Sequence, residues 1–206
     1  KYNIKYYYIN NSGPAYARNF GALKSKGKYL LFLDSDFILP KQFLNNLILI
    51  LKKSNIRAGS IIYGIKSHVD NIFSQDKTFF DFFNISVKLK NKKEKVLIGS
   101  SCIFKRNFFF NKKGFDENIR TPSIEHEEFA KRIGSQNITR LKKIYVIHKF
   151  PTGKKLFSII FMRSRDWMIS KLRKEIEFDG LSRTRATGFF SLQPIIFFIL
   201  LIVSLV

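Results

Sequence analysis

Two aspartates one residue apart, Asp34 and Asp36, directly follow a short apolar run from Tyr29 to Leu33. An apolar run of this length is typical of a buried β-strand. Acids at the carboxyl end of such a strand lie where open α/β sheets bind ligands. Carboxylate oxygens are hard donors, of the kind that hold Mg²⁺ or Mn²⁺ against a diphosphate. The pattern therefore indicates a divalent-cation site, unless the Asp-Ser-Asp sequence forms only a polar turn or a helix cap.

A second group of acids lies between Asp116 and Glu128, and this stretch holds five of the fifteen acidic residues. Mutual repulsion makes such a cluster costly unless a cation or a proton is present. A carboxylate among other acids can have its pKa raised into a range useful for proton transfer, and an imidazole titrates near neutrality. Glu125 and His126 are therefore both candidate general bases. The alternative is that these acids only begin a helix, where negative charge suits the helix dipole.

The residues around the two acid clusters form a longer pattern. Before the strand the chain reads GPAYARNFGALKSKGKY from Gly13, and the second cluster lies in GFDENIRTPSIEHEEFAKR from Gly114. Together they resemble family-2 glycosyltransferases of the GT-A fold. In that family, Gly-Pro-x-x-Ala-Arg-Asn, an apolar strand and Asp-x-Asp precede Gly-Phe-Asp-Glu and a Glu-Asp-x-x-Leu-x-x-Arg helix. The resemblance covers Lys1 to about His148 and lacks the family's opening third, which carries an aspartate that contacts the nucleotide base.

The resemblance implies a reaction and a donor site. A sugar would move from a nucleotide diphosphate sugar to a saccharide or lipid-linked acceptor hydroxyl, with inversion, in cell-surface polysaccharide or glycolipid synthesis. Asp36, assisted by Asp34, would hold Mn²⁺ or Mg²⁺ against the diphosphate, while Arg18 and Asn19 would help to position the donor. The rival interpretation is a non-catalytic, membrane-surface binding protein with a degenerate transferase fold.

Two histidines extend the expected site. The aspartate that usually serves as general base in the family is His126 here, so either His126 or the adjacent Glu125 would take the acceptor's proton, and we favour Glu125 slightly. His148 lies where many relatives carry a histidine. It could complete the metal's coordination with Asp36 or contact the diphosphate, because imidazole suits Mn²⁺. By itself it could equally be a turn residue.

The formal net charge of +22 calls for an anionic partner or a compositional bias. Lysine is spread along the chain and no RNP-like, zinc-finger or helix-turn-helix pattern is present, so we expect a membrane surface and no nucleic acid. The 19 residues from Gly188 to Val206 carry no charge, close to the roughly 20 needed to cross a bilayer. Arg183 and Arg185 just before them place that side in the cytoplasm. The single cysteine, Cys102, excludes an internal disulfide and is expected in the core.

The expected fold class is α/β, a GT-A Rossmann-like sheet with helices on both faces, followed by amphipathic and transmembrane helices. We expect a partial GT-A domain at 1–150, a basic amphipathic segment at 151–187 and a transmembrane helix, cut inside or just after it, at 188–206. The stretch 70–95 is expected to be an irregular excursion on the substrate side. Apolar periodicity and turn residues predict strands at 1–9, 29–33, 58–65, 96–104 and 143–147, and helices at 14–25, 40–53, 125–134 and 154–176.

Overall fold

A computed structural model describes residues 4–65, 75, 78, 79, 82, 97, 98, 100–120, 125–149, 158, 161, 162 and 165. Most of the expected excursion at 70–95, almost all of the segment at 151–187 and all of 188–206 lie outside these residues. Among the helices that are described, none has the length and apolarity needed to cross a membrane.

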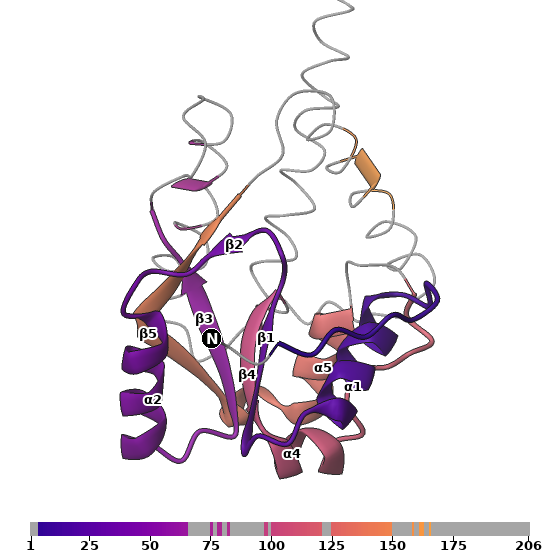
Figure 1. Ribbon diagram of the computed structural model, residues 1–206, viewed down its shortest axis with the longest axis horizontal. Helices are drawn as coiled ribbons and strands as arrows, with labels where there is room; N and C mark the ends of the chain where they lie inside the picture. The colour runs from indigo at the N-terminus through magenta and orange to yellow at the C-terminus, as the bar shows by residue number, and fades with distance from the viewer. Residues whose placement is uncertain are drawn as a thin grey trace, which may run out of the picture.

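A mixed sheet forms the centre of the described part (Figure 1), and its strand order is β1-β4-β3-β5-β2. The strands are β1 (Tyr29–Leu33), β2 (Phe37–Ile38), β3 (Ala58–Tyr63), β4 (Ser101–Lys105) and β5 (Ile138–His148). The helices are α1 (Pro14–Lys24), α2 (Phe43–Lys53), α4 (Arg106–Asn111) and α5 (Glu125–Ile133), and a 3-10 turn, η2, spans Ser135–Asn137. β3 and β5 are parallel, whereas β4 is antiparallel to both β1 and β3.

Helices cover both faces of the sheet, as expected. Side chains along a strand alternate between its faces, so the apolar strands present hydrophobic side chains on each face for a helix to cover. On β1, Leu30 packs with α1, α4 and α5, whereas Leu31 points to the face covered by α2. The first face is built around four buried phenylalanine rings whose centroids lie 5.0–6.2 Å apart, in the edge-to-face and tilted contacts that aromatic rings prefer. These rings belong to Phe104, Phe109, Phe115 and Phe129. Cys102 is buried on the same face, which confirms its prediction as a core residue.

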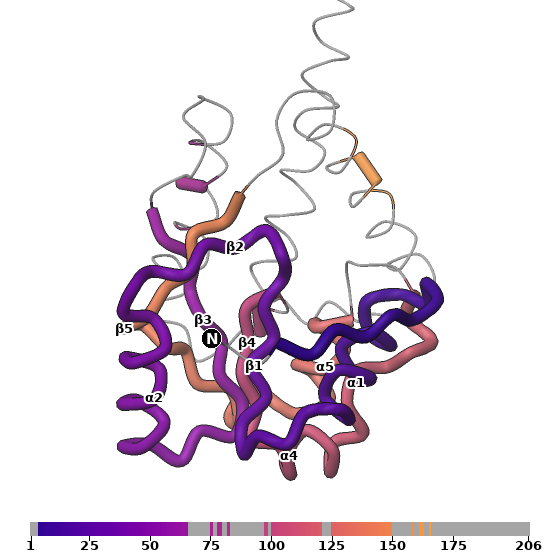
Figure 2. The backbone as a smooth tube through the Cα atoms, viewed as in Figure 1, coloured from indigo at the N-terminus to yellow at the C-terminus, as the bar shows by residue number. Residues whose placement is uncertain are grey.

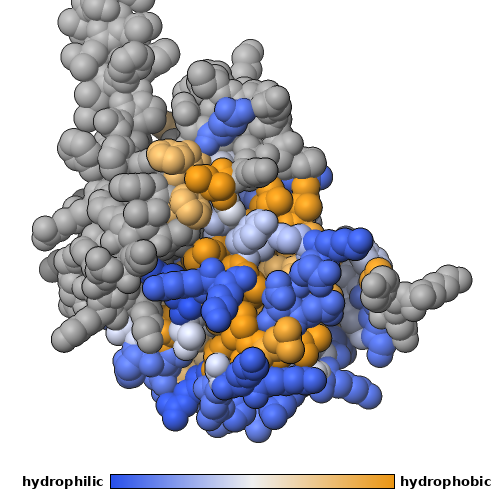
Figure 3. Space-filling view, turned by 90° about the vertical axis from the view of Figure 1, so that its left-hand side faces the viewer, coloured by the Kyte–Doolittle hydropathy of each residue, from blue (hydrophilic) through white to orange (hydrophobic). Residues whose placement is uncertain are grey.

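The side of the molecule that carries α2 shows hydrophobic side chains among hydrophilic ones (Figure 3). Phe43 and Leu47 of α2 are buried against the sheet. Leu44, Ile48 and Leu49 are about half exposed, so the apolar surface of this helix extends beyond the face that packs on the strands.

The local predictions were most accurate where the pattern was strongest. The strand at 29–33 is confirmed residue for residue, and the helices at 14–25 and 125–134 each end one residue early. The strand expected at 1–9 is wrong for its described part, because residues 4–9 belong to no helix or strand. The short elements β2 and α4 were not predicted, and β5 begins at residue 138 rather than 143.

Two boundary errors have visible causes. The strand expected at 96–104 begins only at Ser101, because the Ile98 amide donates to the Ser60 hydroxyl and Ser101 N donates back to Ile98 O, which forms a turn. The helix expected from Pro40 begins at Phe43, since Phe43 N bonds to Pro40 O across a turn before the helical bonds start.

Candidate active site

The loop that carries the two aspartates crosses the carboxyl ends of the sheet. β1 and β2 lie at opposite ends of the strand order, and residues 34–36 connect them over the strand ends (Figure 2). Asp34 N donates to Ser100 O at 3.1 Å, and Lys149 N donates to Asp36 O at 2.8 Å. These backbone bonds attach each aspartate to a different part of the sheet.

Pairing between β2 and β5 brings Asp36 and His148 together. Phe37 lies opposite His148 in the antiparallel register, and His148 Nε2 is 3.4 Å from Asp36 Oδ2. The imidazole packs against the rings of Phe37 and Tyr63, with centroids 5.0 and 5.6 Å away. The Tyr63 hydroxyl forms a 2.7 Å hydrogen bond with the Ser100 hydroxyl. The position of Tyr63 at the carboxyl end of a predicted strand could have marked it as a site residue, but its contacts could not be predicted locally.

Arg18 joins the two acid clusters. From α1, its Nη1 donates to Glu125 Oε1 at 2.6 Å and its Nη2 donates to Asp34 Oδ1 at 3.1 Å. The side chain is largely buried, and its guanidinium also lies 5.8 Å from the centre of the Phe115 ring. Burial by itself lowers the pKa of Arg18, but the charges of Glu125 and Asp34 outweigh it and raise the pKa.

Glu125 is a buried, ionised carboxylate, and its side chain is only 3% exposed. Burial raises its pKa, but the neighbouring His126 and Arg18 outweigh burial and lower the pKa to about 2. The ionised group therefore stabilises the fold above its ordinary pKa of 4.5, and this contribution is lost as the pH falls through about 2. A carboxylate with so low a proton affinity is a weak general base at neutral pH.

His126 lies between two carboxylates of α5. Its Nδ1 is 3.8 Å from Glu125 Oε1, and its Nε2 is 3.8 Å from Glu127 Oε1. These separations are too long for hydrogen bonds, so an ion pair forms with either carboxylate only when the ring is protonated. Within the described residues, His126 Nδ1, Glu125 Oε2 and Asp36 Oδ1 are buried and have no hydrogen-bond partner. Buried polar atoms without partners are costly and rare in folded proteins, so these three atoms are candidates for contact with a ligand.

The hydrogen bonds of the Asn19 side chain go to the loop that carries Phe115 and Glu117. Its Nδ2 donates to Phe115 O and to Glu117 Oε1, both at 2.8 Å, while its Oδ1 accepts from Phe115 N at 3.0 Å. The amide thus fixes the loop that leads from α4 toward α5. Gly114 lies in this loop at φ +62°, and an added Cβ would come within 2.7 Å of Asn19 Oδ1.

We expect Gly114→Ala to destabilise the protein by about 2 kcal/mol, because alanine would be strained at this positive φ and would displace the Asn19 amide. Gly21→Ala is the matched control, since no atom lies within 4 Å of a Cβ at this helical glycine. We expect the control to gain about 0.5–1 kcal/mol from helix propensity. Urea unfolding of the two variants measures both values, and equal stabilities would contradict this account of the loop.

Asp36 and His148 have the chemistry of a divalent-cation site. A carboxylate and an imidazole suit Mn²⁺, and the buried Asp36 Oδ1 is left without a partner among the described residues. No group of three or more His, Cys, Asp or Glu side chains converges within the part of the chain that the structure describes. A cation at phosphates needs only one or two protein carboxylates, because the phosphates and water complete its coordination. The residues present therefore fit a cation shared with a diphosphate. Asp34 is directed to Arg18 instead.

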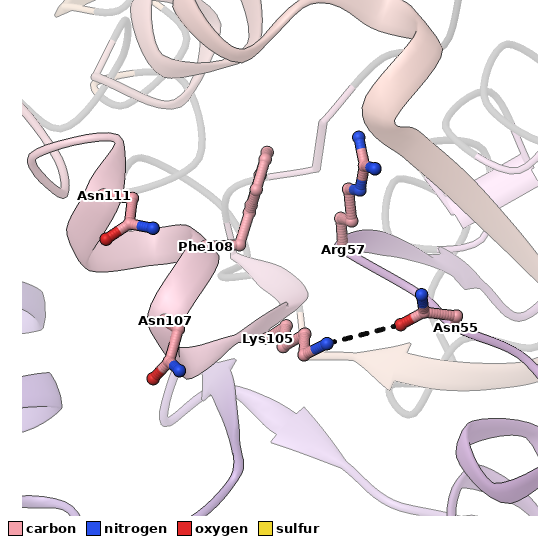
Figure 4. Close-up of a pocket in the computed structure, with 6 residues that line it drawn as sticks. All are labelled: Asn55, Arg57, Lys105, Asn107, Phe108 and Asn111. Atoms are coloured by element: carbon pink, nitrogen blue, oxygen red, sulfur yellow. Dashed lines mark hydrogen bonds between the residues drawn. The ribbon is translucent and has the colours of Figure 1, made fainter.

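A shallow cavity of about 290 Å³ opens at the other end of the sheet (Figure 4). It lies where β3 begins and β4 ends, and its lining includes Arg57, Lys105 and Phe108. Lys105 Nζ is 3.5 Å from Asn55 Oδ1, and Arg57 bonds to Asn137 at 2.9 Å. None of the predicted site residues lines this cavity, so the candidate chemistry stays at the carboxyl end of the sheet.

Known structures share this fold at low sequence identity. The mannosyltransferase PcManGT from Pyrobaculum calidifontis, solved with GDP-Man and Mn²⁺, matches 88% of this chain and 54% of its own, with a TM-score of 0.56 and 14% identity. GalNAc-T7, solved with UDP, GalNAc and Mn²⁺, matches 91% of this chain and 44% of its own, with a TM-score of 0.50 and 14% identity. The central sheet is therefore that of the GT-A glycosyltransferases.

Sequence relatives match a shorter stretch. An uncharacterized glycosyltransferase of Rickettsia bellii (strain RML369-C) is 53% identical over 49 residues, which are 24% of this chain and 7% of that protein. A glycosyltransferase of Rickettsia conorii is 40% identical over 52 residues, 25% of this chain and 9% of that protein. The chain thus spans less than a tenth of each of these relatives and about half of the mannosyltransferase. Residues 1–112 match Glycosyl transferase family 2, and the chain belongs to this family.

Proposed function

We propose that this chain transfers a hexose from a nucleotide diphosphate sugar to an acceptor hydroxyl, with inversion at the anomeric carbon. The observation that carries the proposal is the set of three buried atoms that lack partners among the described residues, Asp36 Oδ1, Glu125 Oε2 and His126 Nδ1. They come from the two acid clusters that Arg18 joins. A donor bound at the first cluster would therefore lie beside proton-accepting groups at the second, as attack by an acceptor hydroxyl requires.

We assign the role of general base to His126 rather than to Glu125. Glu125 is bonded to Arg18 and has a pKa of about 2, so it holds a proton too weakly to accept one efficiently. An imidazole changes its charge close to neutral pH, and the unpartnered Nδ1 of His126 could take the acceptor's proton. Glu125 would stabilise the imidazolium that forms, because a carboxylate 3.8 Å away favours the charged ring.

The donor side is assigned to Asp36, His148 and Asp34. Asp36 and His148 would hold Mn²⁺ or Mg²⁺, with Asp34 assisting through the carboxylate oxygen that does not accept from Arg18. When bound, such a cation acts as a Lewis acid that stabilises charge on the leaving diphosphate. Asn19 would contribute by fixing the loop at Phe115 through its three hydrogen bonds.

The composition supports a proposal for the acceptor and for the location. A net charge of +22 and the uncharged segment at 188–206 support attachment to the cytoplasmic face of a membrane, with anionic lipids as the partner. We therefore propose a saccharide or lipid-linked acceptor, used in cell-surface polysaccharide or glycolipid synthesis.

We expect the full-length protein to release a nucleoside diphosphate from one member of a panel of nucleotide sugars. Release should require Mn²⁺ or Mg²⁺ and stop with EDTA. The reason is that a divalent cation held at the proposed site would neutralise the negative charge of the leaving diphosphate. A coupled assay for nucleoside diphosphate measures the rate, with a nucleoside monophosphate sugar as the control donor. No release from any donor, together with no nucleotide binding by calorimetry, would leave the degenerate binding protein as the better interpretation.

A further inference from the structure

Arg18 contacts both halves of the proposed site and is itself shielded from water. Its Nη2 is 3.1 Å from Asp34 on the donor side, and its Nη1 is 2.6 Å from Glu125 on the acceptor side. The Arg18 side chain is 15% exposed and that of Glu125 is 3% exposed. Removing one partner of a buried ion pair leaves an uncompensated charge in the interior, which is costly. The three side chains are therefore held together as a unit.

These contacts differ from the donor contact that the resemblance implies for Arg18. Both terminal nitrogens of its guanidinium are already directed to carboxylates on different segments of the chain. A guanidinium is a rigid planar fork that can hold two oxygens at a fixed separation, whereas a lysine ammonium is a point charge on a flexible stem. The geometry of Arg18 thus suits a bridge between two protein groups.

We propose that Arg18 is a positioning residue that acts through Asp34 and Glu125, fixing the donor-side carboxylate at a set distance from the acceptor-side pair Glu125–His126. The proposal rests on the proposed transferase function. Arg18 also balances the negative charge of Glu125. The carboxylate can then orient the His126 ring without keeping that ring protonated at all times. In this role Arg18 touches neither the donor nor the acceptor.

The charges around His126 allow a test that separates positioning from a purely structural role. Removing Arg18 should change the pH at which the His126 ring takes up its proton. The carboxylates within 4 Å of its ring nitrogens, among the described residues, are Glu125 and Glu127 of its own helix, and Arg18 of α1 lies behind Glu125. Without Arg18, the charge of Glu125 would act on the imidazole unopposed and favour the imidazolium. The imidazole would then hold its proton to higher pH, and the acid limb of the rate profile would move to higher pH with it.

The experiment compares Arg18→Lys, Arg18→Met and the double variant Arg18→Met/Glu125→Gln with the wild-type protein. Donor affinity is measured by calorimetry, kcat by nucleotide release, and the titration of the His126 ring by NMR, with His126→Gln to identify its signals. We expect Arg18→Lys to lower kcat by about 10²-fold, the effect of a misplacement near 1 Å, with donor affinity changed by less than about threefold. Arg57→Met, at the far end of the sheet, is the matched control and should change none of these.

The double variant decides whether Arg18 positions the neighbouring charged groups or only fills space in the protein interior. In Arg18→Met the ring should titrate at higher pH, and in the double variant, which removes both buried charges, its midpoint should return toward the wild-type value. Loss of donor affinity in Arg18→Lys with kcat retained, or a midpoint that Glu125→Gln does not restore, would overturn the proposal. The ring titration does not depend on turnover, so an inactive wild-type protein would contradict the proposed function and leave this test intact. If Arg18→Met fails to fold, Arg18→Lys still decides the outcome through its kcat and its donor affinity.

Discussion

Asp36→Asn should lower the rate of metal-dependent nucleotide release by about 10³-fold. Asp36 lies beside His148 at 3.4 Å, and its buried Oδ1 has no partner among the described residues. Asparagine keeps the size of the side chain but loses the charge that a divalent cation requires of a hard ligand. Charge stabilisation by such a cation contributes several kcal/mol, and each 1.36 kcal/mol corresponds to a factor of ten in rate.

Two measurements separate a metal ligand from a structural aspartate. Binding of Mn²⁺ in the presence of a nucleoside diphosphate, followed by electron paramagnetic resonance, should weaken in Asp36→Asn while the free energy of unfolding stays close to that of wild type. Asp116→Asn is the isosteric control, because among the described residues its Oδ1 accepts from Asn118 in a local turn, and an amide oxygen can accept the same bonds. Wild-type turnover in Asp36→Asn would exclude Asp36 as a ligand.

His126→Gln should lower the rate of sugar transfer by about 10²- to 10⁴-fold, the range that general-base catalysis contributes. Glutamine keeps a polar side chain at this position but cannot accept the acceptor's proton. Donor affinity should be unchanged, because His126 lies on the acceptor side of Arg18. Transfer to the acceptor and donor binding by calorimetry are the two quantities to compare.

The dependence of kcat/KM on pH distinguishes the two candidate bases. If His126 is the base, the rate should fall on the acid side of the profile, because a protonated imidazole cannot accept the acceptor's proton. If Glu125 were the base, its pKa of about 2 would leave it deprotonated across the accessible range, and the rate would stay flat on the acid side. Glu127→Gln serves as the control. It removes a carboxylate 3.8 Å from the same ring but leaves the proposed base in place, so the fall in rate on the acid side should remain. If kcat/KM of the wild-type protein did not fall at low pH, Glu125 rather than His126 would be the general base.

Local features of the fold were predictable because they depend on residues close in sequence. The apolar run from Tyr29 to Leu33 formed the expected strand, and the helix that begins at Glu125 follows from its acidic first turn and its apolar spacing. The short strand β2 was not predictable in this way. Its two residues form a strand only because they pair with the end of β5, and no local pattern requires that contact.

The sequence by itself determined the family, the positions of the two acid clusters and the residue types available for catalysis, since these are properties of motifs. The tertiary structure decided how the charges are distributed among them. Arg18 and Glu125 are 107 positions apart in the chain, yet His126 and this contact with Arg18 outweigh burial and lower the pKa of Glu125 to about 2. The sequence favours Glu125 slightly as the base, because a carboxylate among acids can have its pKa raised. In the fold, His126 and a buried arginine from another helix lower this pKa instead, because a pKa depends on which charged and polar groups the fold brings near and on how much water it excludes.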